Sequence, residues 1–398
     1  MIAILLAPFY LMLCYYILRW FYKWIGICHQ HFRSKLFRRS FLVLYGFVCL
    51  SPLTSFLIPK GRVHHWLKSL NNYWLGVLLY TLLIIGSADL LRFVCRHIPA
   101  IRDSIYKQRR TFIITGFLAG ILITSISTYG FLHAKQIYPK HYVVTVAKSC
   151  KKRKSLRIVL TADWHLGYSI GNWQMKQMVK KINDLNPDII LVAGDIYDNE
   201  YEAIQNPDKI AVTLSHLKST YGTYACWGNH DVNEKILAGF TFPFGKSTEK
   251  DDSRMRTFLE KSKIHLLEDE AVLIDDSFYV VGRKDPSRSK KLEETRMSPE
   301  QLLAHLDLTK PVFVIDHQPK ELSRLSKAGA DLDLGGHTHD GQMFPGNFTT
   351  RLFWDNSYGY LKTSSMHNIV TSGVGVWGPA MRVGTNSEIV CIDVRMKP

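Results

Sequence analysis

Residues 156–165 read LRIVLTADWH, an apolar and β-branched run that ends in an aspartate and a histidine. The run 156–161 predicts a buried strand, and the side chains that follow it predict a turn at the carboxyl end of that strand. Residues i and i+2 of an extended segment face the same way, so Asp163 and His165 are expected to present two ligands to one side. This stretch therefore predicts a strand followed by a metal-binding turn.

Four further strand-like runs, 189–193, 223–226, 312–315 and 332–334, each lead into polar groups of the same kind. These groups are, in order, Gly194-Asp195, Gly228-Asn229-His230-Asp231, Asp316-His317, and Gly336-His337-Thr338-His339. Ligands of open α/β sheets gather at the carboxyl ends of strands, so the five turns are expected to converge. Amphipathic stretches such as 172–185 and 298–306 separate the runs and predict an α/β fold whose mixed sheets are covered by helices.

The residue types indicate two metal ions. Two divalent ions about 3.5 to 4 Å apart hold both the attacking and the leaving oxygen of a phosphoryl transfer, and a carboxylate can bridge them. Asp195 is the expected bridge. A mixed set of imidazole, carboxylate and amide oxygen ligands suits Mn, Fe or Zn better than Ca or Mg. A single D-x-H motif is weak evidence because most lone buried histidines are core residues, but five such motifs in order are much stronger evidence.

This ordered set resembles the calcineurin-like metallophosphoesterase family over residues 155–394, whose motifs are D-x-H, G-D-x-x-D, G-N-H-[DE], a single His and G-H-x-H. The resemblance implies a four-layer αββα sandwich. It also implies one metal ion held by Asp163, His165, Asp195 and His339, and another held by Asp195, Asn229, His317 and His337. His230 would protonate the leaving oxygen or steady the equatorial oxygens, with Asp231 orienting its ring.

The first third of the chain has a different character. It contains four apolar runs of about membrane-spanning length, at residues 1–18, 41–57, 74–94 and 111–132. Residues 1–154 hold 22 Lys and Arg but only two acidic residues, a net charge of +20, whereas the other 28 Lys and Arg face 32 acidic residues, a net charge of −4. We therefore expect an all-α four-span region at 1–133, a basic linker at 134–154 and the metallophosphoesterase domain at 155–398.

Charge also bears on location and partners. The first and third loops between the spans are the most basic, which predicts a multi-pass membrane protein with its catalytic domain on the outer face. The run Lys151-Lys152-Arg153-Lys154 after the last span argues for the opposite orientation. A cleaved signal peptide is the alternative for residues 1–18, but no basic n-region or small-x-small cleavage site is present. The domain at 155–398 is net acidic, so no nucleic-acid partner is expected. The seven cysteines form no C-x-x-C pair, which argues against a structural zinc site and a disulfide scaffold.

The four-span anchor, residues 316–319 and residues 373–382 resemble the membrane-anchored branch of that family. This resemblance implies hydrolysis of a phosphodiester or pyrophosphate bond by metal-activated hydroxide, on a lipid-linked or cell-envelope substrate such as the UDP-2,3-diacylglucosamine type. That substrate is cytoplasmic, which conflicts with the outward orientation. Two alternatives stay open: a phosphomonoesterase or phosphoprotein phosphatase on the same site, and a membrane scaffold or sensor that binds metal without turnover. The sequence does not predict the oligomeric state.

Overall fold

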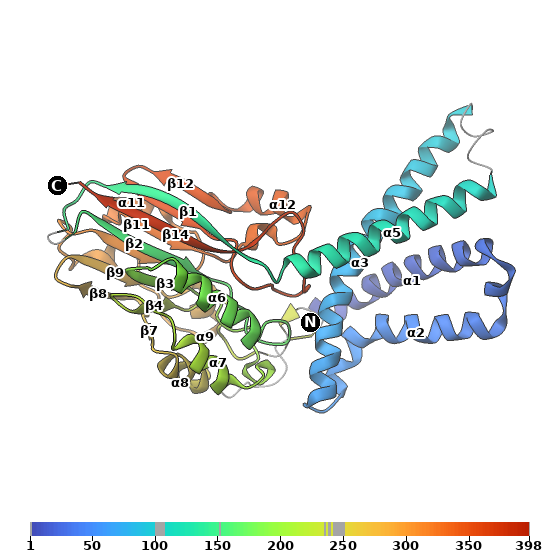
Figure 1. The fold of residues 1–398 in the computed structure, drawn as a ribbon, viewed down its shortest axis with the longest axis horizontal. Coiled ribbons are helices and arrows are strands. Elements are labelled where there is room, and N and C mark those ends of the chain that lie inside the picture. The colour runs from blue at the N-terminus through green and yellow to red at the C-terminus, as the bar shows by residue number, and fades with distance from the viewer. Residues whose placement is uncertain are drawn as a thin grey trace. The chain divides into compact units, whose positions relative to one another are not determined.

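The computed structural model describes residues 2–99, 108–150, 153–234, 236–237, 240–241 and 251–397. Within them the chain forms two compact units, a helical unit made mainly of residues 1–132 and a sandwich unit made mainly of residues 133–398 (Figure 1). Lys151 and Lys152 of the predicted linker lie outside the described residues.

The helical unit contains four long helices in the described part of the chain: α1 (Ile2–Cys28), α2 (Lys35–Thr54), α3 (Arg62–His97) and α5 (Arg109–His133). The 3-10 helix η1 (Gln30–Arg33) joins α1 to α2, which contact each other and run side by side in Figure 1. Ser34 caps α2 because its hydroxyl accepts a hydrogen bond from the Phe37 amide. A second 3-10 helix, η2 (Ser55–Leu57), follows α2.

Three of the described helices, α2, α3 and α5, are long and apolar enough to cross a membrane. The sequence predicts four spans, so the prediction exceeds the observation by one. The first predicted span lies in α1, which continues through Arg19 and Lys23 to Cys28 and is not among the three.

Small and aromatic side chains hold the helical unit together. Its buried apolar cluster draws on all four helices and consists of Cys14, Ile17, Trp20, Cys49, Leu78, Ile85, Ala119 and Ile123. The Tyr10 hydroxyl donates to the Cys49 carbonyl and the Tyr45 hydroxyl donates to the Cys14 carbonyl, each at 2.7 Å, so α1 and α2 are bonded in both directions. A Cβ atom at Gly116 would lie 1.8 Å from Trp24 Nε1, so the glycine allows α5 to approach α1 closely.

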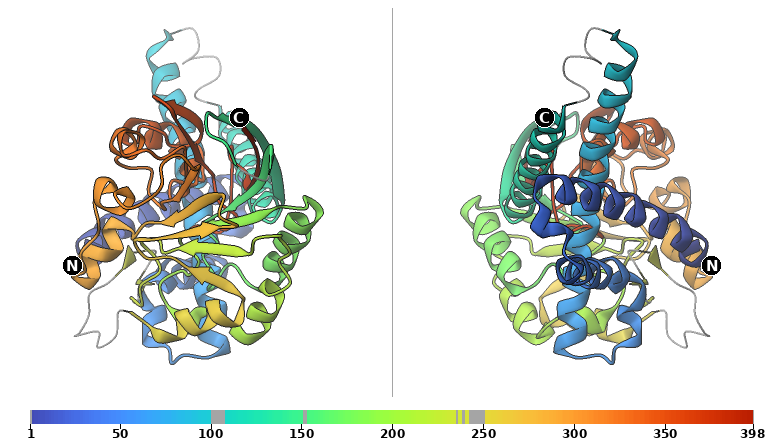
Figure 2. Two further views of the ribbon diagram at one scale, coloured as in Figure 1. Left: turned by 90° about the vertical axis from the view of Figure 1, so that its left-hand side faces the viewer. Right: turned by 90° about the vertical axis from the view of Figure 1, so that its right-hand side faces the viewer.

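The sandwich unit contains two six-stranded mixed sheets within the described residues (Figure 2). The first has the order β1 (Ile137–Val146), β14 (Ser387–Met396), β2 (Ser155–Thr161), β3 (Ile189–Ala193), β4 (Thr223–Cys226) and β7 (Ile264–Leu266). The second has the order β12 (Gly359–Thr363), β13 (Met366–Val370), β11 (Leu332–Gly335), β10 (Val312–Ile315), β9 (Phe278–Gly282) and β8 (Glu270–Ile274). Strands β2, β3 and β4 are parallel, as are β9, β10 and β11, so their carboxyl ends meet at one edge of each sheet.

Strand β1 differs from the sequence prediction, which assigned residues 134–154 to a basic linker. It pairs in parallel with β14, from Ile137 opposite Ser387 to Val146 opposite Met396. Val144 and Val146 are buried and alternate with exposed residues, which is the period of a half-buried strand. Lysines and a proline in the same segment obscure this alternation in the sequence. Strand β1 is the edge strand of the first sheet.

The two sheets pack face to face, and helices cover their outer faces. The core between the sheets contains Ile158, Leu160, Leu191, Phe313, Leu334 and Ile369 among its buried members. Helices α6 (Asn172–Asp184), α7 (Pro207–Leu214) and α8 (Ser253–Lys261) belong to the side of the first sheet, where the Thr161 hydroxyl of β2 lies 3.5 Å from the sulfur of Met178 in α6. Helices α10 (Pro299–Leu303) and α11 (Leu322–Ala328) cover the second sheet through a cluster that includes Val281, Val312 and Leu325. The predicted αββα sandwich is therefore confirmed.

Short elements complete the described chain. They are η4 (Tyr201–Ala203), β5 (Ile236–Leu237), β6 (Phe240–Thr241), α9 (Pro286–Leu292), η5 (His339–Gly341) and α12 (Gly346–Phe353). The seven cysteines are free thiols in the structure.

Candidate metal centre

The polar turns converge at the carboxyl ends of strands from both sheets. Asp163 and His165 follow β2, and Asp195 follows β3 in the first sheet. Asn229 follows β4, whereas His317 follows β10 in the second sheet. His337 and His339 follow β11. The structure therefore brings together all seven side chains that the sequence singled out as metal ligands.

Asp163, His165 and His339 form one ligand group, with one potential ligand atom from each residue within 4.8 Å of the others. The Nε2 atoms of His165 and His339 lie 3.0 Å apart, and Asp163 Oδ1 lies 3.6 Å from His339 Nε2. All three residues are buried. Three ligand atoms that point at one another inside the protein fit a bound cation.

Asp195, His317 and His337 form a second group under the same distance limit. Asp195 Oδ2 lies 3.2 Å from His317 Nε2, which is 3.2 Å from His337 Nδ1. The amide oxygen of Asn229 is also near, at 3.0 Å from His317 Nε2. Asp195 Oδ2 faces the first group as well, at 3.7 Å from His165 Nε2. One carboxylate thus lies between the two groups, and the donor set of imidazole, carboxylate and amide oxygen suits Mn, Fe or Zn.

The backbone at these turns adopts an uncommon conformation. Asp163, His165, Asp195, His337 and His339 all have positive φ, between 47° and 74°. Non-glycine residues reach this left-handed region at a cost of order 1–3 kcal/mol each, and such residues collect at functional sites. The surrounding sandwich must therefore hold these five residues, which lie in three turns, in place.

Two glycines of the motifs make room for the carboxylates. A Cβ atom at Gly228 would lie 2.1 Å from Asp195 Oδ1, and a Cβ atom at Gly336 would lie 2.4 Å from Asp163 Oδ2. Both distances are far below a van der Waals contact, so only glycine allows the backbone to pass so close. The His230 amide then donates to Asp195 Oδ1 at 2.8 Å, and the His337 amide donates to Asp163 Oδ1 at 2.9 Å.

Hydrogen bonds and charge prepare His317 to face a cation. Its Nδ1 donates to the Ala193 carbonyl at 2.8 Å, which leaves Nε2 toward Asp195. Burial alone would lower the pKa of His317, but the Asp195 carboxylate raises that pKa well above its usual value. Burial would likewise raise the pKa of Asp195, but the positive charge at His317 lowers it well below its usual value. The site thus stabilises positive charge strongly.

A buried ion-pair network fixes the turn that carries His317. Arg283 donates to Asp316 Oδ2 at 2.5 Å and to Glu321 Oε2 at 2.9 Å. Arg296 donates to the same two oxygens at 2.9 Å each. Neither Arg283 nor Asp316 is exposed to solvent, so both depend on protein partners rather than water to balance their charge. The network ties the loop after β9 to the turn at residues 316–321.

The environment of His230 corrects one sequence prediction. The Asp231 carboxylate, expected to orient the His230 ring, accepts instead from the Tyr197 amide at 2.9 Å and the Gly228 amide at 2.7 Å. Asn199 Oδ1 lies 2.5 Å from His230 Nδ1 and takes the predicted orienting place. Adjacent residues in a turn point in different directions, which explains why Asp231 reaches the backbone and Asn199 reaches the ring. Burial lowers the pKa of His230 to about 4, so the ring is neutral at pH 7.

Sequence reasoning did not single out two polar groups that contact the cluster. One is Asn199, a polar residue four positions after Asp195. The other is Arg382, a fully buried guanidinium whose Nη2 lies 3.2 Å from His339 Nδ1 and donates to the Gly375 carbonyl at 2.8 Å. The sequence signal for Arg382 is its position in a glycine-rich segment, residues 373–384.

Two partly exposed tryptophans flank the cluster. Trp377 meets the His230 ring edge-to-face at a centroid distance of 5.7 Å, and Trp354 meets the His337 ring at 4.9 Å. Trp377 is 40% exposed. Aromatic surface therefore adjoins the metal-ligand groups on two sides.

Comparison with known proteins agrees with this geometry. Residues 156–341 match the calcineurin-like phosphoesterase family. A Danio rerio protein named transmembrane protein with metallophosphoesterase domain is 28% identical over 346 residues, which cover 83% of this chain and 74% of that protein. An uncharacterized metallophosphoesterase of Helicobacter pylori is 30% identical over 249 residues, 62% of each chain. A UDP-2,3-diacylglucosamine pyrophosphatase of Chlamydia trachomatis is 22% identical over 267 residues, 58% of this chain and 78% of that protein.

Proposed function

Because residues 156–341 of this chain belong to the calcineurin-like phosphoesterase family, we propose that the protein hydrolyses a phosphodiester or pyrophosphate bond with two divalent metal ions. The observation that carries the proposal is the position of Asp195, whose Oδ2 faces His317 Nε2 at 3.2 Å and His165 Nε2 at 3.7 Å. A carboxylate between two ligand groups is the arrangement that a two-metal phosphoesterase needs.

The ligand assignment follows the two groups. Asp163, His165, Asp195 and His339 would hold one ion, and Asp195, Asn229, His317 and His337 would hold the other. When bound, the ions would supply Lewis acidity toward the phosphoryl oxygens and an activated water. The protein's own contribution is to fix the ligand directions through the amides of His230 and His337, and to limit the access of bulk water by burying five of the seven ligands.

His230 is the proposed proton carrier at the leaving oxygen. Nδ1 donates its proton to Asn199 Oδ1, so Nε2 is the ring atom left for the substrate; the neutral ring can accept a proton there, and it gives one to the leaving oxygen only from the imidazolium form that results. The His230 side chain is 15% exposed and can therefore meet a substrate from solvent. Asp231 acts on the backbone of this turn, so its proposed role is to position the His230 segment rather than the ring.

The substrate class that we propose is a lipid-linked or cell-envelope phosphoester. Three apolar helices could place the protein in a membrane, and relatives of this chain are named transmembrane proteins. Trp354 and Trp377 offer partly exposed aromatic surface next to the ligand groups, which suits a substrate with an apolar part. The Chlamydia relative is named for cleavage of a lipid-linked pyrophosphate, which supports this class.

The test uses the full chain purified in detergent and loaded with Mn, Fe or Zn in turn. Hydrolysis of a chromogenic phosphodiester and a chromogenic phosphomonoester is measured for wild type, Asp195→Asn and His230→Ala. Asp184→Asn and His216→Ala serve as matched controls because both residues are exposed and lie outside the metal-ligand groups. Metal-dependent diesterase activity that is lost in the two site variants and kept in the two controls is the expected result.

Other outcomes would redirect the proposal. Preference for the monoester would favour a phosphomonoesterase or phosphoprotein phosphatase. No turnover of either substrate or of lipid extracts, by protein shown to hold two metal ions, would favour a metal-binding scaffold. The proposed orientation, with the domain on the outer face, is tested by a reporter fused after Pro398; activity of a cytoplasmic reporter and silence of a periplasmic one would overturn it.

A further inference from the structure

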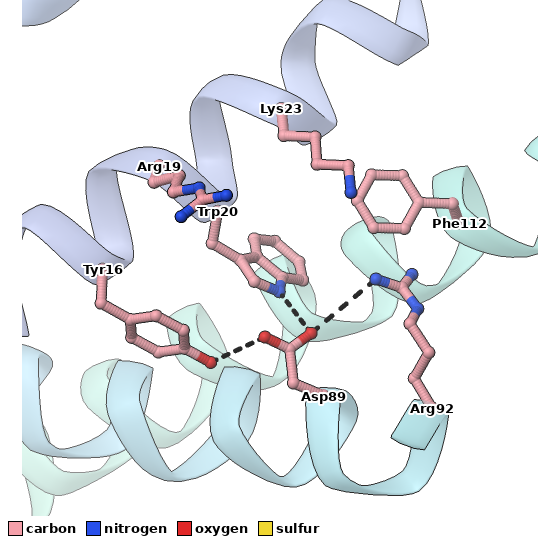
Figure 3. A pocket seen from close by; sticks show the side chains of 7 residues that line it. All are labelled: Tyr16, Arg19, Trp20, Lys23, Asp89, Arg92 and Phe112. Atoms are coloured by element: carbon pink, nitrogen blue, oxygen red, sulfur yellow. Dashed lines mark hydrogen bonds and ion pairs between the residues drawn. The ribbon is translucent and has the colours of Figure 1, made fainter. Parts of the chain in front are cut away.

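A cavity of about 240 Å³ lies within the helical unit, between α1, α3 and α5 (Figure 3). Its lining consists of Tyr16, Arg19, Trp20, Lys23, Asp89, Arg92 and Phe112. A single water needs only about 15 Å³ of such space, so the cavity can hold a group of phosphate size. The metal centre described above uses none of these residues.

The one acid of the lining has its donors already in place. Asp89 accepts from the Tyr16 hydroxyl at 2.8 Å and from Trp20 Nε1 at 3.2 Å, and Arg92 approaches it at 3.7 Å. Figure 3 shows these three contacts meeting at the Asp89 carboxylate. The hydrogen bonds hold α1 against α3 at the cavity, and the Asp89 carboxylate balances the positive charge of Arg92.

The remaining charge of the cavity is positive. Three cations, Arg19, Lys23 and Arg92, line it against the single carboxylate of Asp89. In the part of the chain that the structure describes, no acidic side chain forms an ion pair with Arg19 or Lys23. Arg92 and Lys23 lie over the Phe112 ring, at 4.1 Å and 5.6 Å from its centroid. Two cations that have no acidic partner among the described residues, beside an acid that already accepts two hydrogen bonds, fit an anion with several oxygens.

The surroundings indicate where such an anion would come from. Arg19 and Lys23 follow the apolar run 1–18. Asp89 and Arg92 lie in the last part of the apolar helix α3, and Phe112 lies in the first turn of α5. The cavity therefore lies toward the end of the helical unit where α1 and α3 finish and α5 begins. Phosphate groups of membrane lipids occupy the level where apolar helices end, and basic pockets between helices at that level bind acidic headgroups.

We propose that this cavity binds the phosphate of an acidic membrane lipid, with Arg19, Lys23 and Arg92 as its donors and Asp89 holding the walls. The shared chemistry is a phosphate oxyanion, and a soluble phosphate is the other source that could provide it. Arg92 is braced by Asp89 and Phe112, whereas Arg19 and Lys23 are exposed and can close on the headgroup.

The experiment counts lipids bound to the full chain in a neutral detergent by native mass spectrometry. The probes are a short-chain phosphatidic acid, the matched phosphatidylcholine, inorganic phosphate and glycerol phosphate. The test variant is Arg19→Gln/Lys23→Gln, and the matched control is Lys35→Gln/Arg39→Gln, which removes the same charge from exposed positions outside the cavity. Metal content and circular dichroism confirm that each variant is folded.

We expect one phosphatidic acid to bind much more tightly than phosphatidylcholine. At about a fivefold contribution per cation, the test variant should bind it about 30-fold more weakly, while the control keeps wild-type affinity. Equal losses in the test variant and the control, or equal binding of the two lipids, would overturn the proposal. If glycerol phosphate or inorganic phosphate displaced the lipid at equal concentration, the ligand would be a soluble phosphate, and the proposal of a lipid ligand would be wrong. A single variant, Arg92→Gln, provides a second measurement and should also weaken phosphatidic acid binding.

Discussion

The two polar centres of this protein have opposite charge balance. In the sandwich unit, ligand atoms of carboxylates, imidazoles and an amide oxygen converge on the same space. In the helical unit, one carboxylate has its donors in place and two cations are left over. The first arrangement suits cations and the second suits an anion. The difference teaches that the sign of the unsatisfied groups, rather than the number of polar residues, indicates what a site binds.

The largest expected effect comes from removing the carboxylate that both ligand groups share. Asp195→Asn keeps the shape of the side chain but removes its charge, so at least one metal ion should be lost and turnover should fall by more than about 100-fold, the upper range found for groups outside the ligand shell. Elemental analysis and diesterase assays measure the two effects. Full metal content and normal turnover in Asp195→Asn would show that the charge of Asp195 is not needed to bind the metal ions, so the two centres would not differ in the way described.

Arg283→Met tests the buried network beside the site. It removes a fully buried guanidinium that pairs with Asp316 and Glu321, and should lower the free energy of unfolding by about 3–5 kcal/mol. Urea unfolding followed by fluorescence measures the change. Arg157→Met is the control, since Arg157 is 43% exposed in its pair with Asp393 and should cost about 1 kcal/mol or less. Equal losses in both variants would show that burial does not set the strength of these pairs.

Asn199→Ala should slow turnover without removing metal. The variant frees His230 Nδ1 from its partner at 2.5 Å, so the ring loses its orientation and kcat should fall by about 10- to 100-fold. The metal ligands keep their own hydrogen bonds, so metal content and KM should stay close to wild type. A variant that loses metal instead would place Asn199 among the groups that hold the ions.

Glu321→Gln should give the smallest effect, and one that depends on pH. Burial would raise the pKa of Glu321, but Arg283 and Arg296 lower it below the ordinary value of 4.5. A lowered pKa in the folded state means that the stabilisation is present above pH 4.5 and is lost as the pH falls below that value. Thermal unfolding of wild type and variant should therefore differ at pH 7 and converge at low pH. A difference that does not change with pH would exclude the charge of Glu321 as its cause.

The sequence predicted much of the sandwich because its strands are short apolar runs that end in turn residues, and the five motifs fixed where those turns meet. The sequence does not predict the directions of adjacent side chains in a turn. His230 and Asp231 are adjacent, yet the ring meets Asn199 and the carboxylate meets Tyr197 and Gly228. The periodicity of apolar residues predicts helices and strands, but it does not predict which way side chains point in a turn. The charges at Lys135, Lys140 and Lys148 predict a juxtamembrane linker, whereas pairing with β14 decides the conformation of β1.

The helical unit was harder to predict in detail. Hydropathy places apolar segments, but α3 has 36 residues, about 54 Å at 1.5 Å per residue, and extends beyond the predicted span at both ends. Within α3, Asp89 lies 3.7 Å from Arg92, three positions later, a contact that local helix spacing can predict. Its bonds to Tyr16 and Trp20 come from a helix about 70 positions away and could not be read from local spacing.

The place of Asp195 between the two ligand groups has a consequence for metal loading. A cation in either group takes up part of the charge that the same carboxylate offers to the other, so the two binding constants cannot be independent. Occupancy of one group must alter the affinity of the other, and the alteration is reciprocal. A titration with metal should therefore deviate from two identical, independent sites, and the population of the half-loaded form should depend on the sign and size of the coupling between the two groups.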